Sequence, residues 1–133
     1  MAAFLNKARN NICVANILVE SNLHISSAHP AYYSSFLMLK YILAHFDSIS
    51  YTKQGELTKD KESHNVLSGL ALPFLVDKDK IHGNDYLVWY NKLKMMRNKA
   101  DYKPENIEDS LLEKNLEYAK EFISSIMMHF KIV

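Results

Sequence analysis

The sequence predicts an all-α fold, an up-and-down bundle of four long helices and one shorter helix. Only three glycines and three prolines interrupt 133 residues, so turns are few. Hydrophobic residues make up 48% of the chain, which is enough for a sizeable core. Apolar side chains recur at helical spacing in five segments. The length predicts one domain that spans residues 1–133.

The first predicted helix spans residues 3–18, and the second spans residues 30–46. One face of the first carries Phe4, Ala8, Ile12, Ala15 and, just beyond it, Val19. Pro30 suits the first turn of the second helix, where its missing N–H costs nothing. The stripe of this second helix consists of Tyr33, Phe36, Leu37, Tyr41 and Ala44, broadened by Met38, Leu39, Ile42 and Leu43. A helix that is apolar around much of its girth is usually central.

Residues 47–61 are predicted to form a polar connection. The third and shorter helix begins near Ser63, and Pro73 is expected to end or kink it. After the loop "DKDKIHGND", Asn84 or Asp85 is expected to cap the fourth helix, which runs to about Tyr102.

Asn106 is expected to cap the fifth helix. Its core face consists of Ile107, Leu111, Leu112, Leu116, Ala119, Phe122, Ile123 and Ile126. The stretch "YLVWY" at 86–90 has residues that favour strands. Helical periodicity nevertheless continues beyond it through Arg97 and Ala100, which favours the helix.

Composition and charge limit the classes of function. A net charge of +1 means that any nucleic-acid binding must come from a local patch. The single cysteine, Cys13, fits a reducing cytoplasm, where we expect the protein to be. Polar residues interrupt the N-terminal segment, which argues against a signal peptide. No apolar run approaches the roughly 20 residues of a membrane-spanning helix, so we expect no membrane partner.

Arg97 lies on an apolar stripe with Tyr86, Tyr90, Leu93 and Ala100. In one structural interpretation its stem covers apolar surface while its head reaches water. In another it pairs with Asp101, four residues further on. In the functional interpretation the guanidinium is an anion site, because its rigid fork of donors suits phosphate.

A local basic cluster surrounds this arginine. It consists of Lys92, Lys94, Arg97, Lys99 and Lys103, which either contact RNA phosphates or form an ordinary solvated helix face. Nearby aromatic residues can stack bases, but at helical spacing we interpret most of them as core. These are Tyr32, Tyr33, Phe36, Tyr86, Trp89 and Tyr90.

The chain resembles the HEPN family of small helical domains. "HPAYYSSFLMLKYILA" is similar to the central helix of that family, and "YNKLKMMRNKADY" is similar to the end of its later helix. "SHNVL" resembles the start of its third long segment. The resemblance implies a homodimer and a metal-independent ribonuclease, often the toxin partner of a nucleotidyltransferase-type antitoxin. It also implies that the arginine binds the scissile phosphate while a histidine four to six residues later transfers protons.

This sequence departs from the family at that histidine. The corresponding positions hold Tyr102, Lys103 and Pro104. A tyrosine with a pKa of about 10 is a poor base at neutral pH, although it can donate a hydrogen bond to phosphate. We therefore expect binding to survive better than cleavage, which is expected to be weak or absent.

The expected site residues are grouped by role. The catalytic candidates are Arg97 and Tyr102, the phosphate-binding candidates are Arg97, Asn98 and Lys94, and the cleft-lining candidates are Asp101, His64 and Tyr33. His64 is interpreted as a surface or cap-adjacent histidine, with the cleft as the alternative.

Metal and cofactor binding are not expected. His24 and His29 lie five residues apart without an acidic or cysteine companion, which is not a metal-binding spacing. Two hypotheses for function remain. One is an RNA- or nucleotide-phosphate-binding domain with ribonuclease chemistry. The other is a non-catalytic helical module that dimerises or docks a nucleotidyltransferase.

Overall fold

The computed structural model describes residues 3–103 and 106–132, and within them it contains helices and no strand. The elements are α1 (Ala3–Glu20), the 3-10 turn η1 (His24–Ser27), α2 (Ala28–His45), α3 (Tyr51–Leu57), α4 (Ser63–Lys78), α5 (Gly83–Tyr102) and α6 (Asp109–His129). The all-α prediction is confirmed, and "YLVWY" is helical within α5.

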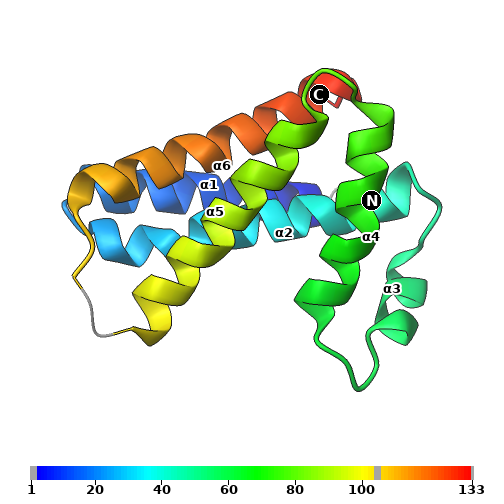
Figure 1. Cartoon of the computed structure of the whole chain (residues 1–133), viewed down its shortest axis with the longest axis horizontal. Helices are drawn as coiled ribbons and strands as arrows, with labels where there is room; N and C mark the ends of the chain where they lie inside the picture. Colours follow the sequence, from blue (N-terminus) through cyan, green and yellow to red (C-terminus); the bar gives the residue numbers. More distant parts are fainter. Residues whose placement is uncertain (1–2, 104–105, 133) are drawn as a thin grey trace.

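Helix α2 is the centre of the fold. In Figure 1, α1, α2 and α6 run in similar directions, while α4 and α5 cross them more steeply. Helix α2 contacts α1, α3, α4, α5 and α6. The apolar side chains around α2 therefore pack against the surrounding helices, and the predicted central position of this helix is confirmed. The large side chains Tyr32, Met38, Leu39 and Ile42 are almost fully buried.

Two expectations for residues 47–78 differ from the structure. The connection at 47–61 contains α3, whose N-cap Ser50 accepts a hydrogen bond from the backbone N–H of Lys53. Helix α4 does not end at Pro73 but continues to Lys78. A proline leaves the carbonyl four residues earlier without its donor. Here that residue is Gly69, which is exposed like Pro73, so water can satisfy the carbonyl.

The expected caps of the last two helices also differ. The N-cap of α5 is His82, and the expected caps Asn84 and Asp85 lie inside the helix. Instead of either residue, the Asp79 carboxylate holds the turn by accepting the N–H groups of Ile81 and His82.

Helix α6 begins at Asp109 with Glu108 as its N-cap, so Asn106 does not cap it. Six residues of its expected core face are buried, namely Leu112, Leu116, Ala119, Phe122, Ile123 and Ile126. Leu111 is 49% exposed and Ile107 precedes the helix, so the apolar face is narrower than predicted.

Helices α4 and α5 form a hairpin that is closed at one end. A Cβ at Gly83 would lie 3.1 Å from the Cα of Val76, so a side chain here would push the two backbones apart by a few tenths of an ångström. From there the helices separate, and the start of α4 and the end of α5 lie at the open end of the hairpin (Figure 1). This arrangement places His64 and Arg97 at the same end of the molecule.

Candidate functional site

Arg97 lies at the edge of the core, in the last two turns of α5. Its side chain is 22% exposed, and its Nε donates to Oδ2 of Asp101 at 3.1 Å. Its Nη2 donates to the Tyr102 hydroxyl at 3.4 Å. The guanidinium carbon lies 5.6 Å from the centre of the Tyr32 ring. Both structural interpretations therefore hold, yet the remaining guanidinium N–H groups have no hydrogen-bond partner among the described residues.

His64, in the first turn of α4, is joined to the core by a chain of hydroxyls. Its Nδ1 lies 2.6 Å from the Tyr32 hydroxyl, which lies 2.9 Å from the hydroxyl of Tyr90. The imidazole also stacks on Phe36, with ring centres 3.9 Å apart and planes 8° apart. His64 is cap-adjacent, as one interpretation of the sequence had it, since Glu62 is the N-cap of α4, and its ring also packs against core aromatic side chains.

The surroundings of His64 favour its neutral form. Burial lowers the pKa of His64, and the positive charge of Arg97 lowers it further, while Glu62 acts in the opposite direction. Burial also raises the pKa of Tyr32 and of Tyr90, so both hydroxyls keep their protons. At neutral pH this part of the molecule holds an uncharged imidazole beside a guanidinium.

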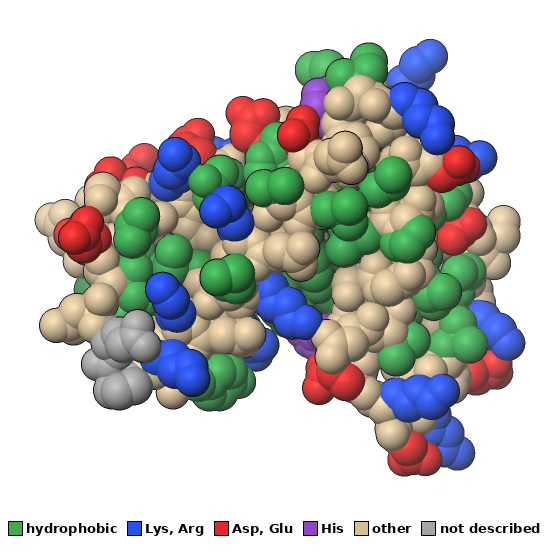
Figure 2. Space-filling model, in the orientation of Figure 1, with side chains coloured by type: hydrophobic (Ala, Val, Ile, Leu, Met, Phe, Trp, Pro, Cys, Tyr) green, Lys and Arg blue, Asp and Glu red, His purple; other side chains and the backbone are tan. Residues whose placement is uncertain are grey.

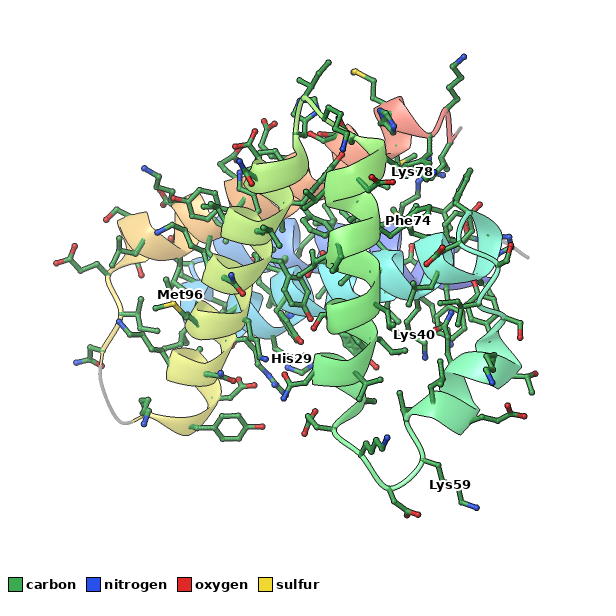
Figure 3. All side chains as sticks on the ribbon, turned by 45° about the vertical axis from the view of Figure 1, so that its right-hand side comes forward. His29, Lys40, Lys59, Phe74, Lys78 and Met96 are labelled. Atoms are coloured by element: carbon green, nitrogen blue, oxygen red, sulfur yellow. The ribbon has the colours of Figure 1, made fainter. Side chains whose placement is uncertain are left out.

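His29, in the first turn of α2, enters the same cluster. Its Nδ1 lies 3.3 Å from Oδ2 of Asp101, the oxygen that also accepts from Arg97. Its ring meets Tyr33 edge-on at 5.6 Å, and the Tyr33 ring lies 6.4 Å from that of His64. Figure 3 shows His29 between the separated ends of α5 and α4. We call Arg97, Asp101, His29, His64 and Tyr32 the Arg97 site.

The other predicted site residues have different places. Lys94 donates to the amide oxygen of Asn65 on α4, which puts its charge beside the Arg97 site. Tyr33 is half-buried, and its ring lies near both histidines. The side chain of Asn98 is half-buried and makes no hydrogen bond to the described residues. The phosphate-binding role of Asn98 stays a prediction.

The five basic residues do not form one patch. Lys92 and Lys99 line a pocket between α5 and α6, on a different face of α5 from Lys94 and Arg97. In Figure 2, basic side chains and a histidine border the notch between α5 and α4. Only part of the predicted cluster therefore lies at the Arg97 site.

A groove between α1 and α2 continues from the Arg97 site. It has a volume of about 470 Å³ and is lined by Phe4, Lys7, Asn10, Asn11, His29, Tyr33 and Leu37. His29 and Tyr33 belong to both places. A ligand at Arg97 can therefore extend along a surface with one further positive charge and two amides.

Two further features concern metals and membranes. Within residues 3–103 and 106–132, no group of three His, Cys, Asp or Glu side chains is arranged to hold a metal ion. None of the helices in the described part of the chain has the length and hydropathy needed to cross a bilayer.

Comparison with known proteins gives one finding. The family model of the HEPN domain matches residues 1–129. Searches of curated proteins and of solved structures returned no significant match. Because the match covers nearly the whole chain, the chain belongs to the HEPN domain family, and the resemblance seen in the sequence is confirmed.

Proposed function

We propose that this HEPN domain binds RNA through a backbone phosphate at Arg97 and cleaves it without a metal ion. The observation that carries the proposal is a guanidinium that Asp101 orients, with donors left unpaired within the described residues, beside a neutral histidine. Membership in a family with nucleotide- and RNA-related functions supports it. Where the family histidine would stand this chain has Tyr102, but His64 lies beside Arg97 instead.

The chemistry around Arg97 suits a single RNA strand better than a duplex. An arginine fork and the Lys94 ammonium are donors for phosphate oxygens. The half-buried ring of Tyr33 and the half-exposed ring of His29 offer faces on which an unpaired base can stack. Lys7, in the adjoining groove, is placed for a neighbouring phosphate.

The test is RNA binding and cleavage by the purified protein in excess chelator. We expect Arg97→Ala to weaken the binding of single-stranded RNA about tenfold or more, since a lost charge-assisted hydrogen bond is worth roughly 1.5–3 kcal/mol. Arg9→Ala is the matched control, because Arg9 lies on α1 and contacts Met127. Equal RNA affinity of Arg97→Ala, Arg9→Ala and the parent would overturn the proposal.

We further propose that the domain is a homodimer. Val88, Met95 and Tyr102 are spaced seven residues apart on α5 and are 50%, 62% and 68% exposed. Such an apolar stripe is typical of a contact surface. It ends at Tyr102, which touches Arg97, so a symmetric contact would bring two Arg97 sites together.

The dimer is tested by light scattering over a range of concentrations. We expect Met95→Glu to shift the protein toward monomer, while Met128→Glu on α6, where the side chain is 79% exposed, should not. A parent that stays monomeric at high concentration would contradict the dimer.

A non-catalytic docking module is the second candidate function, and the same exposed stripe favours it. A nucleotidyltransferase would then cover α5 in place of a second copy. The exposed single cysteine, Cys13, fits a cytoplasmic location for either function.

A further inference from the structure

We propose that His64 and His29 divide the proton transfers of RNA cleavage between them, His64 as general base and His29 as general acid. This inference rests on the proposed function. The family assigns proton transfer to one histidine that follows the arginine on the same helix. Here the two imidazoles come from α4 and α2; Asp101 joins His29 to Arg97 of α5, and the charge of Arg97 acts on His64.

His64 has the geometry of a base. The proposal assigns its Nδ1–H to the bond with the Tyr32 oxygen, and the Tyr32 O–H to the bond with Tyr90. Nε2 then carries the free lone pair, and it has no hydrogen-bond partner among the described residues. The charged groups that act on this ring are Arg97 and Lys94 of α5, Glu62 before α4 and His29 of α2.

His29 has the geometry of an acid. Its Nδ1 lies 3.3 Å from the Asp101 carboxylate, which orients the ring, and the proposal assigns the transferred proton to Nε2. The His29 side chain is 49% exposed, so a substrate can reach it. A carboxylate that also binds Arg97 couples the position of the acid to that of the phosphate-binding group.

The two histidines both lie near one aromatic ring. Tyr33 lies 5.6 Å from His29 and 6.4 Å from His64, measured between ring centres. An in-line displacement at phosphorus needs its base and its acid on opposite sides of the phosphate. The proposal places the phosphate between the two imidazoles, with Arg97 as its ligand.

The reaction then balances without a metal or a co-reactant. Nε2 of His64 accepts the proton of the ribose 2′-hydroxyl as the 2′-oxygen attacks phosphorus. Arg97 binds the phosphoryl oxygens as negative charge builds on them. The bond from phosphorus to the 5′-oxygen breaks, and that oxygen takes the proton from Nε2 of His29. The products are a 2′,3′-cyclic phosphate and a 5′-hydroxyl, with His64 protonated and His29 neutral.

The experiment separates the two roles with a second substrate. An RNA whose scissile 5′-oxygen is replaced by sulfur has a leaving thiolate that needs no proton. For ordinary RNA we expect His64→Gln and His29→Ala each to lower the cleavage rate about a hundredfold or more. For the sulfur-substituted RNA, His29→Ala should regain most of the parent rate, whereas His64→Gln should stay slow.

The pH profiles provide a second readout. Parent cleavage of ordinary RNA should rise and then fall with pH, because the base must be neutral and the acid protonated. With the sulfur-substituted RNA the fall at high pH should disappear. Tyr32→Phe tests the positioning residue, because it frees Nδ1 of His64 and should slow both substrates alike while RNA affinity is kept.

The outcomes distinguish this inference from the proposed function. His45→Ala is the control, since His45 is at the far end of α2 and should cleave both substrates like the parent. Equal losses of His29→Ala on both substrates would show that His29 is not the acid. Cleavage that requires Arg97 but neither histidine would refute the roles assigned to His64 and His29. It would still support the proposed ribonuclease function. Binding through Arg97 without any cleavage would also refute it, and would leave the proposed RNA binding intact.

Discussion

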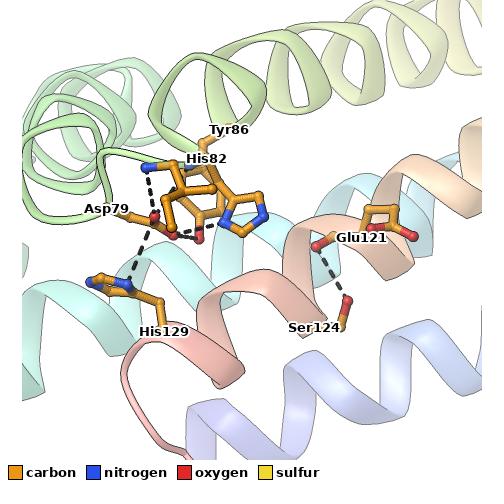
Figure 4. A network of polar contacts seen from close by, with 7 residues as sticks. Asp79, His82, Tyr86, Glu121, Ser124 and His129 are labelled. Atoms are coloured by element: carbon orange, nitrogen blue, oxygen red, sulfur yellow. Dashed lines mark hydrogen bonds and ion pairs between the residues drawn. The ribbon is translucent and has the colours of Figure 1, made fainter.

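Helix α5 carries a polar cluster at each end, and the two are built from the same kinds of side chain. At its start, the buried Asp79 meets His82, Tyr86 and His129, which we call the Asp79 cluster (Figure 4). At its end lies the Arg97 site, again with a carboxylate, histidines and tyrosines. The two clusters differ in how much of their hydrogen-bonding capacity is already used.

The Asp79 cluster is closed. Asp79 is 1% exposed, and its carboxylate accepts from the Tyr86 hydroxyl at 2.7 Å and from Nδ1 of His82 at 3.2 Å. It also accepts from two backbone N–H groups, and His129 lies 3.7 Å away. Every strong acceptor position is engaged, so this cluster holds the α4–α5 turn and has little left for a ligand.

The Arg97 site is open. Within the described residues, guanidinium donors and Nε2 of His64 remain without partners, and His29 and Asp101 are partly exposed. Similar residue types therefore serve structure at one end of a helix and suit recognition at the other. The unused capacity, rather than the residue types, separates a candidate site from a structural cluster.

Removal of the Asp79 carboxylate should give the largest effect. Asp79→Ala leaves the buried Tyr86 hydroxyl and two backbone N–H groups without their acceptor, so we expect a loss of about 3 kcal/mol in the free energy of unfolding. Urea denaturation measures it. RNA affinity of the folded fraction should stay near that of the parent. If affinity instead falls as much as in Arg97→Ala, the division between the two ends of α5 is wrong.

Arg97→Ala should show the opposite pattern. The pair with Asp101 is partly exposed, so we expect stability to change by about 1 kcal/mol at most. Anisotropy with labelled RNA should show the tenfold loss of affinity described above. If the variant unfolds, or if it binds RNA like the parent, Arg97 has a structural role and not the proposed phosphate-binding role.

Lowering the pH should reduce the contribution of the Asp79 cluster to the free energy of unfolding. Burial alone would raise the pKa of Asp79, but hydrogen bonds from Tyr86 and His82 and the charge of His129 outweigh it and lower that pKa. A lowered folded-state pKa gives stability that is present above the unfolded pKa of about 3.9 and is lost as the pH falls toward the folded value. Chemical denaturation at a series of pH values should show a shallower acid limb in Asp79→Asn than in the parent.

Tyr102→Phe should give the smallest effect. Its hydroxyl accepts a long, 3.4 Å hydrogen bond from Arg97, and the side chain is 68% exposed. We expect RNA affinity to fall about twofold to threefold, because a long and largely exposed hydrogen bond contributes little. A tenfold loss would make Tyr102 a direct phosphate ligand.

Local periodicity predicted the fold well. The girth of α2 and the stripe from Tyr86 to Ala100 depend on spacing within one helix, and both are present. The errors concern single positions. Pro73 does not end α4 because its neighbourhood is exposed, and a carboxylate four residues before Gly83 holds the start of α5 in place of a residue at the cap.

The candidate site was predicted only in part. The Arg97–Asp101 pair follows from spacing on one helix and was foreseen. His29 was missed because its partner Asp101 is 72 residues away, and nothing near His29 in the sequence indicates that contact. The contacts of His64 with Tyr32 and Phe36 were missed for the same reason. The sequence carried one indication of such a contact. Tyr32 and Tyr90 are buried, and a buried tyrosine hydroxyl needs a hydrogen-bond partner.

The tight approach at Gly83 also has a mechanical consequence. Arg97 is 14 residues along α5 from Gly83, about 21 Å of helix axis. A tilt of about 5° at that pivot displaces the guanidinium by about 2 Å, more than the reach of a hydrogen bond tolerates. A small tilt of α5 about the contact between Val76 and Gly83 is therefore amplified at the far end of the helix. The position of Arg97 therefore depends in part on a backbone contact at the opposite end of α5.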